Sequence, residues 1–280
     1  MATDVVAGVR KVVTAPVSAL DALGDQMSFY VRAMAWTPRT IRHYKKETMR
    51  LLSEVVFGSG SLAIIGGTVG VIAFLSFFTG TEVGLQGYAA LNQLGTAALT
   101  GFASAYINTR EIAPLVAGLA LSATVGAGFT AQLGAMRISE EIDALEVMAV
   151  PSLPFLVTTR IIAGFIAVIP LYIIGLLTSY LASRTIVVVF NGQSTGTYDH
   201  YFRTFLRPDD VFWSFVVAII IAMFVMINHC YFGYNASGGP VGVGEAVGIA
   251  MRASLVAVAT VVLLASLALY GTNPNFNLTV

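Results

Sequence analysis

Apolar residues along this chain fall into six long stretches that contain no Asp, Glu, Lys or Arg. The stretches cover residues 55–81, 83–109, 112–136, 161–183, 211–244 and 253–280. A helix needs about 20 mostly apolar residues to cross the hydrocarbon core of a bilayer, so all six are long enough. The second is the weakest candidate, because several Gln, Asn and Thr side chains interrupt it. The pattern therefore predicts a helical membrane protein with five or six spans.

The number of spans decides which loops face the cytoplasm. With five spans and a re-entrant second stretch, the inner loops would hold 11 Lys and Arg residues and the outer loop 3. With six spans the corresponding counts would be 12 and 3. Positive charges concentrate on the cytoplasmic side, so both topologies place the N-terminus in the cytoplasm. The charge count leaves the choice between five and six spans open.

Residues 1–54 precede the first stretch and carry eight of the 15 Lys and Arg residues. Thr37 is expected to cap a helix with Pro38 in its first turn. Beyond it, basic and apolar residues alternate at helical spacing, and aromatic residues typical of membrane interfaces lie just before it. We expect amphipathic helices along the cytoplasmic membrane surface here, with a solvated helix of a soluble domain as the alternative.

A short acidic segment lies between the third and fourth stretches. Ser139 can cap a helix whose first turn carries Glu140 and Glu141, which suits the positive end of the helix dipole. An apolar stripe would run along one face of it, formed by Ile138, Ile142, Leu145 and Met148, with Asp143 and Glu146 off that stripe. Pro151 and Pro154 are expected to stop the helix.

The charge of this predicted helix, residues 138–150, bears on what it contacts. Four acids against a single Arg disfavour an anionic lipid surface, because like charges repel there. An amphipathic helix that enters a groove on a soluble partner fits the pattern better. A capped, solvated turn without a partner is the alternative interpretation.

Arg110 and Glu111 interrupt the apolar pattern just before Pro114. Charged residues at membrane depth are functional candidates by default. Adjacent residues do not share a helix face, so these two need not pair with each other. The alternative is a charged pair at a membrane–water boundary.

Composition supports the membrane interpretation and argues against nucleic-acid binding and metal binding. Hydrophobic residues make up 56% of the chain and charged residues 11%, with a mean hydropathy of +0.80, whereas soluble domains carry about 25% charged residues. The net charge of zero gives no basic face for nucleic acid. Cys230 is the one cysteine, and His43, His200 and His229 show no metal-ligand spacing. We expect His229 to lie at the membrane interface.

Glycine spacing in the spans indicates close helix packing. Gly66 and Gly70 form one GxxxG pair, Gly244 and Gly248 form another, and Gly126 and Gly128 lie in a third small-residue run. The run GAGFTA at 126–131 also matches a dinucleotide fingerprint, but it lies inside a charge-free stretch instead of a βαβ unit, so helix packing is the better interpretation. The three lysines do not end a P-loop, so this chain is not expected to bind ATP by that route.

Two segments resemble a known family. Residues 110–160, REIAPLVAGLALSATVGAGFTAQLGAMRISEEIDALEVMAVPSLPFLVTTR, and 232–258, FGYNASGGPVGVGEAVGIAMRASLVAV, are similar to the MlaE/YrbE permeases. These are the membrane subunits of ABC transporters that work with MCE proteins in lipid trafficking. The resemblance covers residues 45–272 and is greatest to the YrbE subunits of actinobacterial Mce systems.

The resemblance implies an all-α integral membrane fold with five transmembrane helices and a re-entrant segment. Residues 1–54 would form cytoplasmic and interfacial helices, and 55–280 the permease domain. The spans would cover about 55–79, 112–136, 161–183, 211–233 and 253–272, with 83–109 re-entrant. The N-terminus would be cytoplasmic and the C-terminus outside, in a bacterial plasma membrane.

The resemblance also implies partners. The helix at 138–150 would be the coupling helix that docks on a cytoplasmic ABC ATPase dimer, which would carry the ATP and Mg. A second YrbE-type permease would complete a heterodimer, hexameric MCE proteins would sit outside, and the substrate would be a lipid. This chain would be a transporter subunit, not an enzyme, with no cofactor of its own. An ATP-independent lipid channel or scramblase and a membrane anchor for MCE proteins are the alternatives.

Overall fold

The computed structural model describes residues 20–21, 23–57 and 67–271. Every regular element in this part of the chain is a helix. A helix over residues 23–35 comes first. The later α-helices are α2 (Thr37–His43), α3 (Lys45–Phe57), α5 (Thr68–Gln93), α6 (Thr100–Ile107), α7 (Ala113–Leu121), α8 (Ala127–Ile138), α9 (Glu141–Val147), α10 (Thr159–Thr185), α11 (Thr195–Phe205), α12 (Pro208–Tyr234) and α13 (Gly239–Tyr270).

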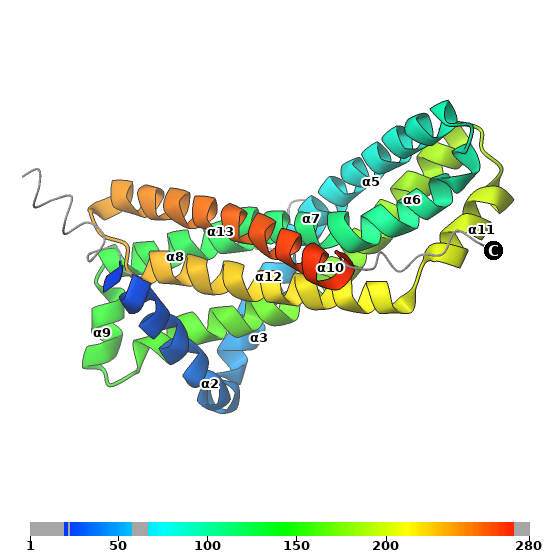
Figure 1. Ribbon diagram of the computed structural model, residues 1–280. Coiled ribbons are helices and arrows are strands. Elements are labelled where there is room, and N and C mark those ends of the chain that lie inside the picture. Colours follow the sequence, from blue (N-terminus) through cyan, green and yellow to red (C-terminus); the bar gives the residue numbers. More distant parts are fainter. Residues whose placement is uncertain (1–19, 22, 58–66, 272–280) are drawn as a thin grey trace, which may run out of the picture.

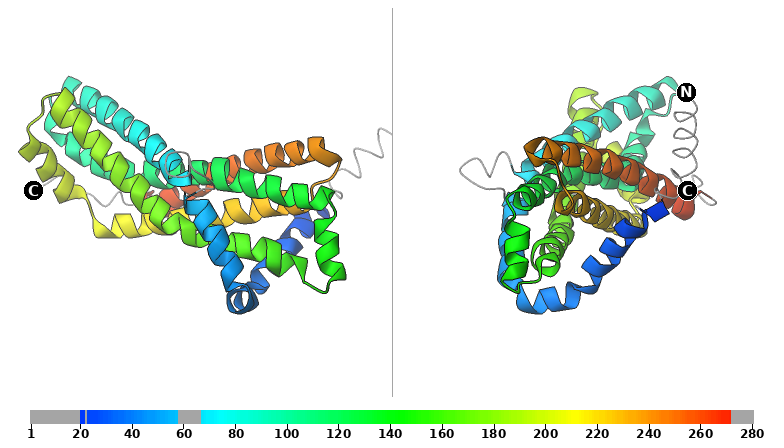
Figure 2. Two further views of the ribbon diagram at one scale, coloured as in Figure 1. Left: turned by 180° about the vertical axis from the view of Figure 1, so that it is seen from behind. Right: turned by 90° about the vertical axis from the view of Figure 1, so that its left-hand side faces the viewer.

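The helices form an elongated bundle with two distinct ends. Figure 1 shows α9 at one end and the α5–α6 turn with α11 at the other, and the reverse view in Figure 2 agrees. Helices α8, α12 and α13 run side by side toward the α9 end, while α2 and α3 project to one side of the bundle (Figures 1 and 2). The two ends therefore carry different surface elements.

Five helical runs in the described chain are long and apolar enough to cross a membrane. They cover Thr68–Gln93, Ala97–Ile138, Leu153–Phe190, Pro208–Tyr234 and Gly239–Tyr270. This confirms the all-α membrane fold and selects five spans over six. The two longest runs hold 42 and 38 residues. At about 1.5 Å per residue they exceed the roughly 30 Å hydrocarbon core, so both extend beyond it.

The bounds of the first spans differ from the sequence expectation. Residues 55–57 end α3, residues 58–66 lie outside the described chain, and the first spanning helix begins at Thr68 instead of near Val55. That helix also continues through Glu82, where the sequence pattern had placed a break. The helix tolerates this charge because Glu82 lies on its surface and accepts a hydrogen bond of 2.7 Å from Gln86.

The stretch expected to be re-entrant, residues 83–109, is divided between two helices. Its first part completes α5, a turn with Gly95 at φ +71° reverses the chain, and its second part begins the long run that leads through α6 into α7 and α8. A positive φ is adopted readily by glycine. The segment thus forms the closed end of a helical hairpin, with the end of α5 on one side of the turn and α6 on the other. Its depth in a membrane remains a prediction.

Within the described residues, four π-helical segments interrupt the long helices: Asn108–Ile112, Ser122–Gly126, Leu153–Thr158 and Ile186–Phe190. Such bulges occur frequently at functional sites, because the extra residue redirects the side chains that follow. The first two lie in the single run that joins α6, α7 and α8. They contain Arg110, Glu111 and Ser122, which are described below.

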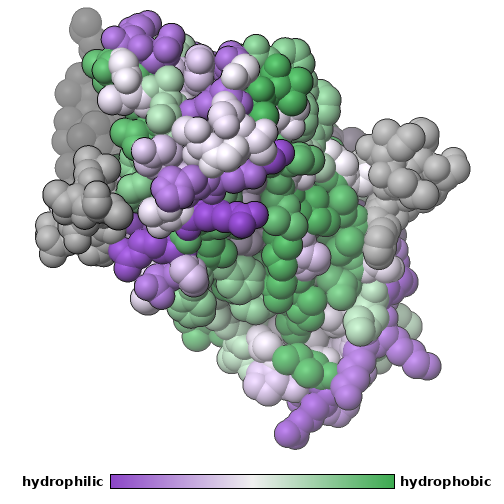
Figure 3. All heavy atoms as spheres, turned by 90° about the vertical axis from the view of Figure 1, so that its right-hand side faces the viewer, coloured by the Kyte–Doolittle hydropathy of each residue, from purple (hydrophilic) through white to green (hydrophobic). Residues whose placement is uncertain are grey.

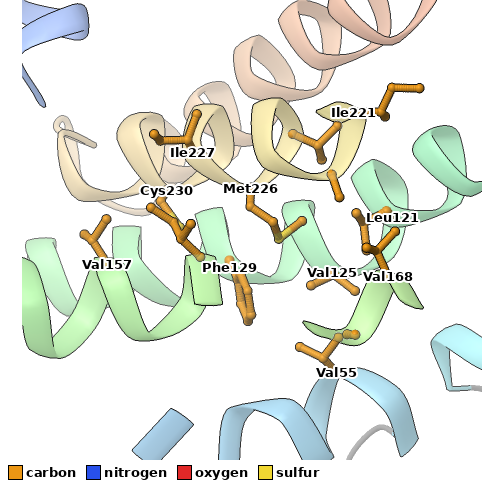
Figure 4. Close-up of a cluster of buried hydrophobic side chains, with 14 of the residues drawn as sticks. Val55, Leu121, Val125, Phe129, Val157, Val168, Ile221, Met226, Ile227 and Cys230 are labelled. Atoms are coloured by element: carbon orange, nitrogen blue, oxygen red, sulfur yellow. The ribbon is translucent and has the colours of Figure 1, made fainter. Parts of the chain in front are cut away.

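The core lies where α8, α10 and α12 meet (Figure 4). Phe129, Val168 and Met226 are buried there with Cys230. Close backbone approach makes this packing possible: a Cβ on Gly126 would lie 2.5 Å from the His229 ring. Small residues at such contacts are the main device for packing helices in lipid.

The other glycines singled out for packing differ from Gly126. A Cβ on Gly128 or Gly244 would meet nothing within 4 Å, and one on Gly248 would meet only the end of the Arg252 side chain. These three therefore do not hold helices together within this chain. Gly70 is half-buried in the first turn of α5, and Gly66 lies outside the described residues.

Candidate functional site

Helix α9 is short, and a residue with left-handed backbone conformation flanks it at each end. Glu140 at its N-cap has φ 61°, and Ala149 beyond its end has φ 59°. The expected cap, Ser139, instead donates to the carbonyl of Ala135 (2.9 Å) and so closes α8. Its hydroxyl also lies 3.0 Å from the Glu141 carboxylate, which is an alternative acceptor for the same hydrogen. The helix therefore begins one residue later than the capping pattern predicted, and it ends at Val147, before the two prolines.

The predicted apolar stripe of α9 is divided between the interior and the surface. Ile142 is fully buried and Leu145 is half-buried against the core, so these two attach the helix to its own chain. Met148 is 65% exposed and Ile138 37% exposed. Val147, which was not on the predicted stripe, is 88% exposed. The prediction that these four side chains form one exposed apolar face was therefore wrong.

The exposed surface of α9 is acidic with an apolar end. Glu140, Glu141, Asp143 and Glu146 are exposed, and Val147 and Met148 follow them. Asp143 forms an ion pair of 2.8 Å with Arg137 at the end of α8. A partner that meets this surface would encounter negative charge together with two apolar side chains, while Ile142 and Leu145 stay inside.

Hydrogen bonds connect α9 to the end of α12. The Ser152 hydroxyl donates to the Glu146 carboxylate at 2.6 Å and shares a 2.8 Å hydrogen bond with the Tyr234 hydroxyl. Ser152 is itself buried, whereas Glu146 is exposed, so the two bonds lie at the edge of the interior. A cavity of about 300 Å³ lies beside them, lined in part by Arg32 and Trp36 from the N-terminal helices. This end of the molecule thus joins α9, α12 and the N-terminal region.

The N-terminal helices pack on the bundle as well as exposing basic residues. Thr158 donates to the Ala33 carbonyl at 2.9 Å, and Phe29 contacts the ring of Tyr234 at 5.6 Å between centroids. Pro38 lies in the first turn of α2, as expected. Thr37 is already the first helical residue, so Trp36 occupies the N-cap in its place, and Trp36 makes no side-chain cap.

Arg110 is buried in the first π segment and forms an ion pair with Asp210 at the start of α12. The Nη2–Oδ2 distance is 2.8 Å. The guanidinium carbon also lies 4.0 Å from the ring centroids of both Tyr106 and Tyr270. A buried charge is tolerated only with such partners, so Asp210 and the two rings together hold Arg110 in place.

Glu111 has a different partner from its neighbour. Its carboxylate accepts a hydrogen bond of 2.6 Å from Ser266 near the end of α13. Pro114 is buried in the first turn of α7, just beyond the π segment. Arg110 and Glu111 therefore do not pair with each other in this geometry, and they connect α12 and α13 to the same segment. Asp210, Ser266 and Tyr270 carried no sequence signal, because each is distant in sequence from residue 110.

His229 and Asn228 form a second cluster of polar contacts inside the bundle, separate from the contacts of Arg110 and Glu111. His229 is fully buried, so its side chain does not face the membrane interface as expected but points into the bundle. Its Nε2 lies 3.0 Å from the Ser122 hydroxyl and its Nδ1 2.8 Å from that of Thr130. Asn228 donates to the Ser254 hydroxyl of α13 at 2.8 Å. Two adjacent residues of α12 thus connect it to α8, with the π segment before it, and to α13.

Arg160, at the start of α10, is a further buried cation that sequence analysis did not single out. It donates to the Leu156 carbonyl at 2.8 Å and to the Gln132 amide oxygen at 3.3 Å. Its guanidinium also lies 5.6 Å from the Phe129 ring. In the sequence it is the charge that directly precedes the long apolar stretch 161–183. The described residues contain no group of three His, Cys, Asp or Glu side chains that could hold a metal ion.

Comparison with known proteins shows which family this chain matches. The model of the family described as Permease MlaE matches residues 58–268, which include α9, the Arg110–Asp210 pair and His229. This chain belongs to the MlaE permease family. As a permease family member with five apolar helices, it is a multi-pass membrane transport subunit and not a catalytic enzyme.

Named relatives are similar over about two thirds of this chain. A probable ABC transporter permease of Rickettsia bellii is 31% identical over 176 residues, which is 63% of this chain and 68% of the relative. The intermembrane phospholipid transport system permease protein MlaE of Haemophilus influenzae is 26% identical over 177 residues, again 63% and 68%. The chloroplastic protein TRIGALACTOSYLDIACYLGLYCEROL 1 of Arabidopsis thaliana is 27% identical over 195 residues, 68% of this chain and 55% of the relative.

Proposed function

We propose that this chain is the membrane subunit of an ATP-driven lipid transporter, and that α9 is its contact with a separate ABC ATPase. Membership of the MlaE permease family supports a transport role, and the H. influenzae relative is named for phospholipid transport. The observation that carries the ATPase contact is the surface of α9, where four exposed acids precede the exposed Val147 and Met148. Two exposed apolar side chains beside four acids suit a groove on a partner better than solvent.

In this proposal, ATP with Mg binds to the ATPase dimer, and this chain binds neither. Closure of the ATPase would move α9 as a lever. The movement would reach α12 through Glu146, Ser152 and Tyr234, whose hydrogen bonds join the two elements. It would then reach α13 through Asn228 and Ser254. A packed helix with two alternative positions is the kind of element that carries such a change.

The proposed partners follow from the surfaces that remain uncovered. The most apolar windows of α5 and α13 are only 28% and 17% buried, against 61% for the run that contains α7. These faces would meet lipid and a sister permease of the YrbE type, and the lipid would pass between the two subunits. Hexameric MCE proteins would sit at the end that carries α11. The α9 end and the N-terminus would face the cytoplasm of a bacterium, and the C-terminus would lie outside the plasma membrane.

Lipid transfer in proteoliposomes tests this proposal. The chain, its sister permease and the ATPase are reconstituted, and the transfer of a labelled phospholipid to MCE acceptor protein is followed with ATP and without nucleotide. We expect transfer to require hydrolysable ATP. Transfer at the same rate without nucleotide would contradict the proposal and support an ATP-independent channel or scramblase. Binding of MCE protein without any lipid transfer would support the anchor function instead.

A further inference from the structure

An open groove lies at the end of the molecule opposite α9, where α11 packs against the last turns of α10. Its volume is about 600 Å³. Leu177, Leu181 and Phe202 provide apolar walls, while Arg184, Asp199 and Arg203 lie among them. Figure 3 views this end of the molecule and shows hydrophilic residues gathered beside a broad hydrophobic area. The groove is separate from the Arg110 network and from α9.

The position of Arg184 relates this groove to the depth of a bilayer. The charge-free stretch 161–183 begins directly after the buried Arg160 and ends directly before Arg184. At about 1.5 Å per residue, a helix of this length covers roughly 35 Å, slightly more than the hydrocarbon core. Arg184 therefore lies at the level of the lipid headgroups when the stretch spans the bilayer.

The groove has an apolar surface directly below this level. Leu177 and Leu181 lie one helical turn apart on α10, and each is 61% exposed. Ile173, a further turn away, is 47% exposed. These side chains form a continuous apolar track along α10 that ends at Arg184. An acyl chain can lie along such a track while its headgroup remains beside the arginine.

The charged groups of the groove are unequal in number. Arg184 donates to both carboxylate oxygens of Asp199, at 2.9 and 3.1 Å, so Asp199 is held by one guanidinium. Arg203 lies one turn further along α11, is exposed, and forms no ion pair among the described residues. Two cations against one anion leave a net positive charge, which suits a phosphate group.

We propose that this groove binds an anionic phospholipid, with the headgroup phosphate at Arg203 beside the Arg184–Asp199 pair and an acyl chain along Leu177 and Leu181. Phosphate and hydrocarbon are recognised together by a cation at headgroup depth above an apolar track. The proposal requires that the chain span a bilayer. It does not depend on coupling to an ATPase, so either idea can fail while the other stands.

The test uses the full chain in nanodiscs of phosphatidylcholine that contain a minor fraction of phosphatidylglycerol. Leu181 is replaced by the photocrosslinking residue p-benzoylphenylalanine, and the lipid adducts are identified by intact mass. We expect phosphatidylglycerol in the adducts well above its fraction in the nanodisc. Substitution Arg203→Gln should lower this enrichment about fivefold, because a cation near a lipid surface contributes about 1 kcal/mol to anionic binding. Arg203→Lys should retain most of it.

Two controls separate a site from general lipid contact. The same probe at Leu264, which is 58% exposed on α13, should show no enrichment. Arg207→Gln, at the same end but outside the groove, should leave the enrichment at Leu181 unchanged. Equal enrichment at both probe positions, or no effect of Arg203→Gln in protein with wild-type thermal stability, would overturn the proposal. Loss of the enrichment in excess inorganic phosphate would also overturn it, because the groove would then bind free phosphate instead.

Discussion

Arg110 and Asp210 form a buried ion pair at 2.8 Å, although 99 residues separate them and Glu111 is the immediate neighbour of Arg110. The pair joins the π segment before α7 to the first turn of α12. Glu111 reaches in another direction, to Ser266 on α13. Three helices are thus connected at one point, which gives Arg110 and Glu111 a structural role whatever their part in transport.

Breaking the Arg110–Asp210 pair should be strongly destabilising. Asp210→Asn or Arg110→Met leaves one buried charge without its counterion, which typically costs about 3–5 kcal/mol. The double variant Arg110→Met, Asp210→Leu removes both charges, so we expect it to be more stable than either single variant. Thermal unfolding in detergent measures this, with Arg207→Gln as an exposed control. A double variant as unstable as Arg110→Met would contradict the account.

The Glu111–Ser266 bond should hold the end of α13 to the bundle. Ser266→Ala removes the donor and should lower stability by only about 1 kcal/mol. Hydrogen exchange should nevertheless become faster in the last turns of α13, because only 17% of the most apolar window of this helix is buried and its end therefore depends more on polar contacts. Thr260→Ala is the matched control, since the Thr260 hydroxyl bonds only within α13, to the Val256 carbonyl. Equal exchange in both variants would show that the bond does not anchor the helix.

Two glycines two residues apart should respond in opposite ways to alanine. On Gly126 the new Cβ would lie 2.5 Å from the His229 ring, so Gly126→Ala should destabilise the protein by about 1–3 kcal/mol. Gly128 has open space, so Gly128→Ala should be neutral or stabilise the helix by up to roughly 1 kcal/mol. Thermal stability of the two variants compares them directly. A neutral Gly126→Ala would show that α8 and α12 are packed less closely than described.

The contact between α11 and α10 should weaken in acid. The hydrogen bonds from Arg184 hold the pKa of Asp199 below its usual value. A lowered folded pKa gives stability that is present above the unfolded pKa, about 4, and is lost as the pH falls through the folded pKa. The pair is partly exposed, so its contribution should stay below about 1 kcal/mol. Hydrogen exchange of α11 should therefore accelerate below about pH 4 in wild type, and Asp199→Asn should remove this pH dependence.

The sequence predicted the helical elements better than the contacts between them. Charge-free stretches were sufficient to predict the fold class, and the acidic segment marked α9. The break at Glu82 was misplaced because a single exposed charge does not interrupt a helix. The α5–α6 turn was missed because Gly95 lies among residues without charge. Such turns are set by backbone conformation and not by hydropathy.

The candidate sites required the structure. Local spacing on α9 could not distinguish Ile142, which faces the core, from Met148, which faces outward, because the neighbouring helices decide which side is covered. The partners of Arg110 and His229 come from distant elements, so one sequence gives no indication of them. Physical reasoning did predict correctly that adjacent Arg110 and Glu111 need not form a pair.

Recovery of an ATPase with this chain tests the role of α9 most directly. Complexes are purified in detergent from native membranes and identified by mass spectrometry, with a Val147→Glu, Met148→Glu variant and a Leu94→Glu control. Both mutated sites are strongly exposed, so neither variant should affect folding. We predict that the α9 variant loses the ATPase but retains a sister permease, while the control retains both. Recovery of the ATPase in equal amount with the α9 variant would contradict the proposed contact.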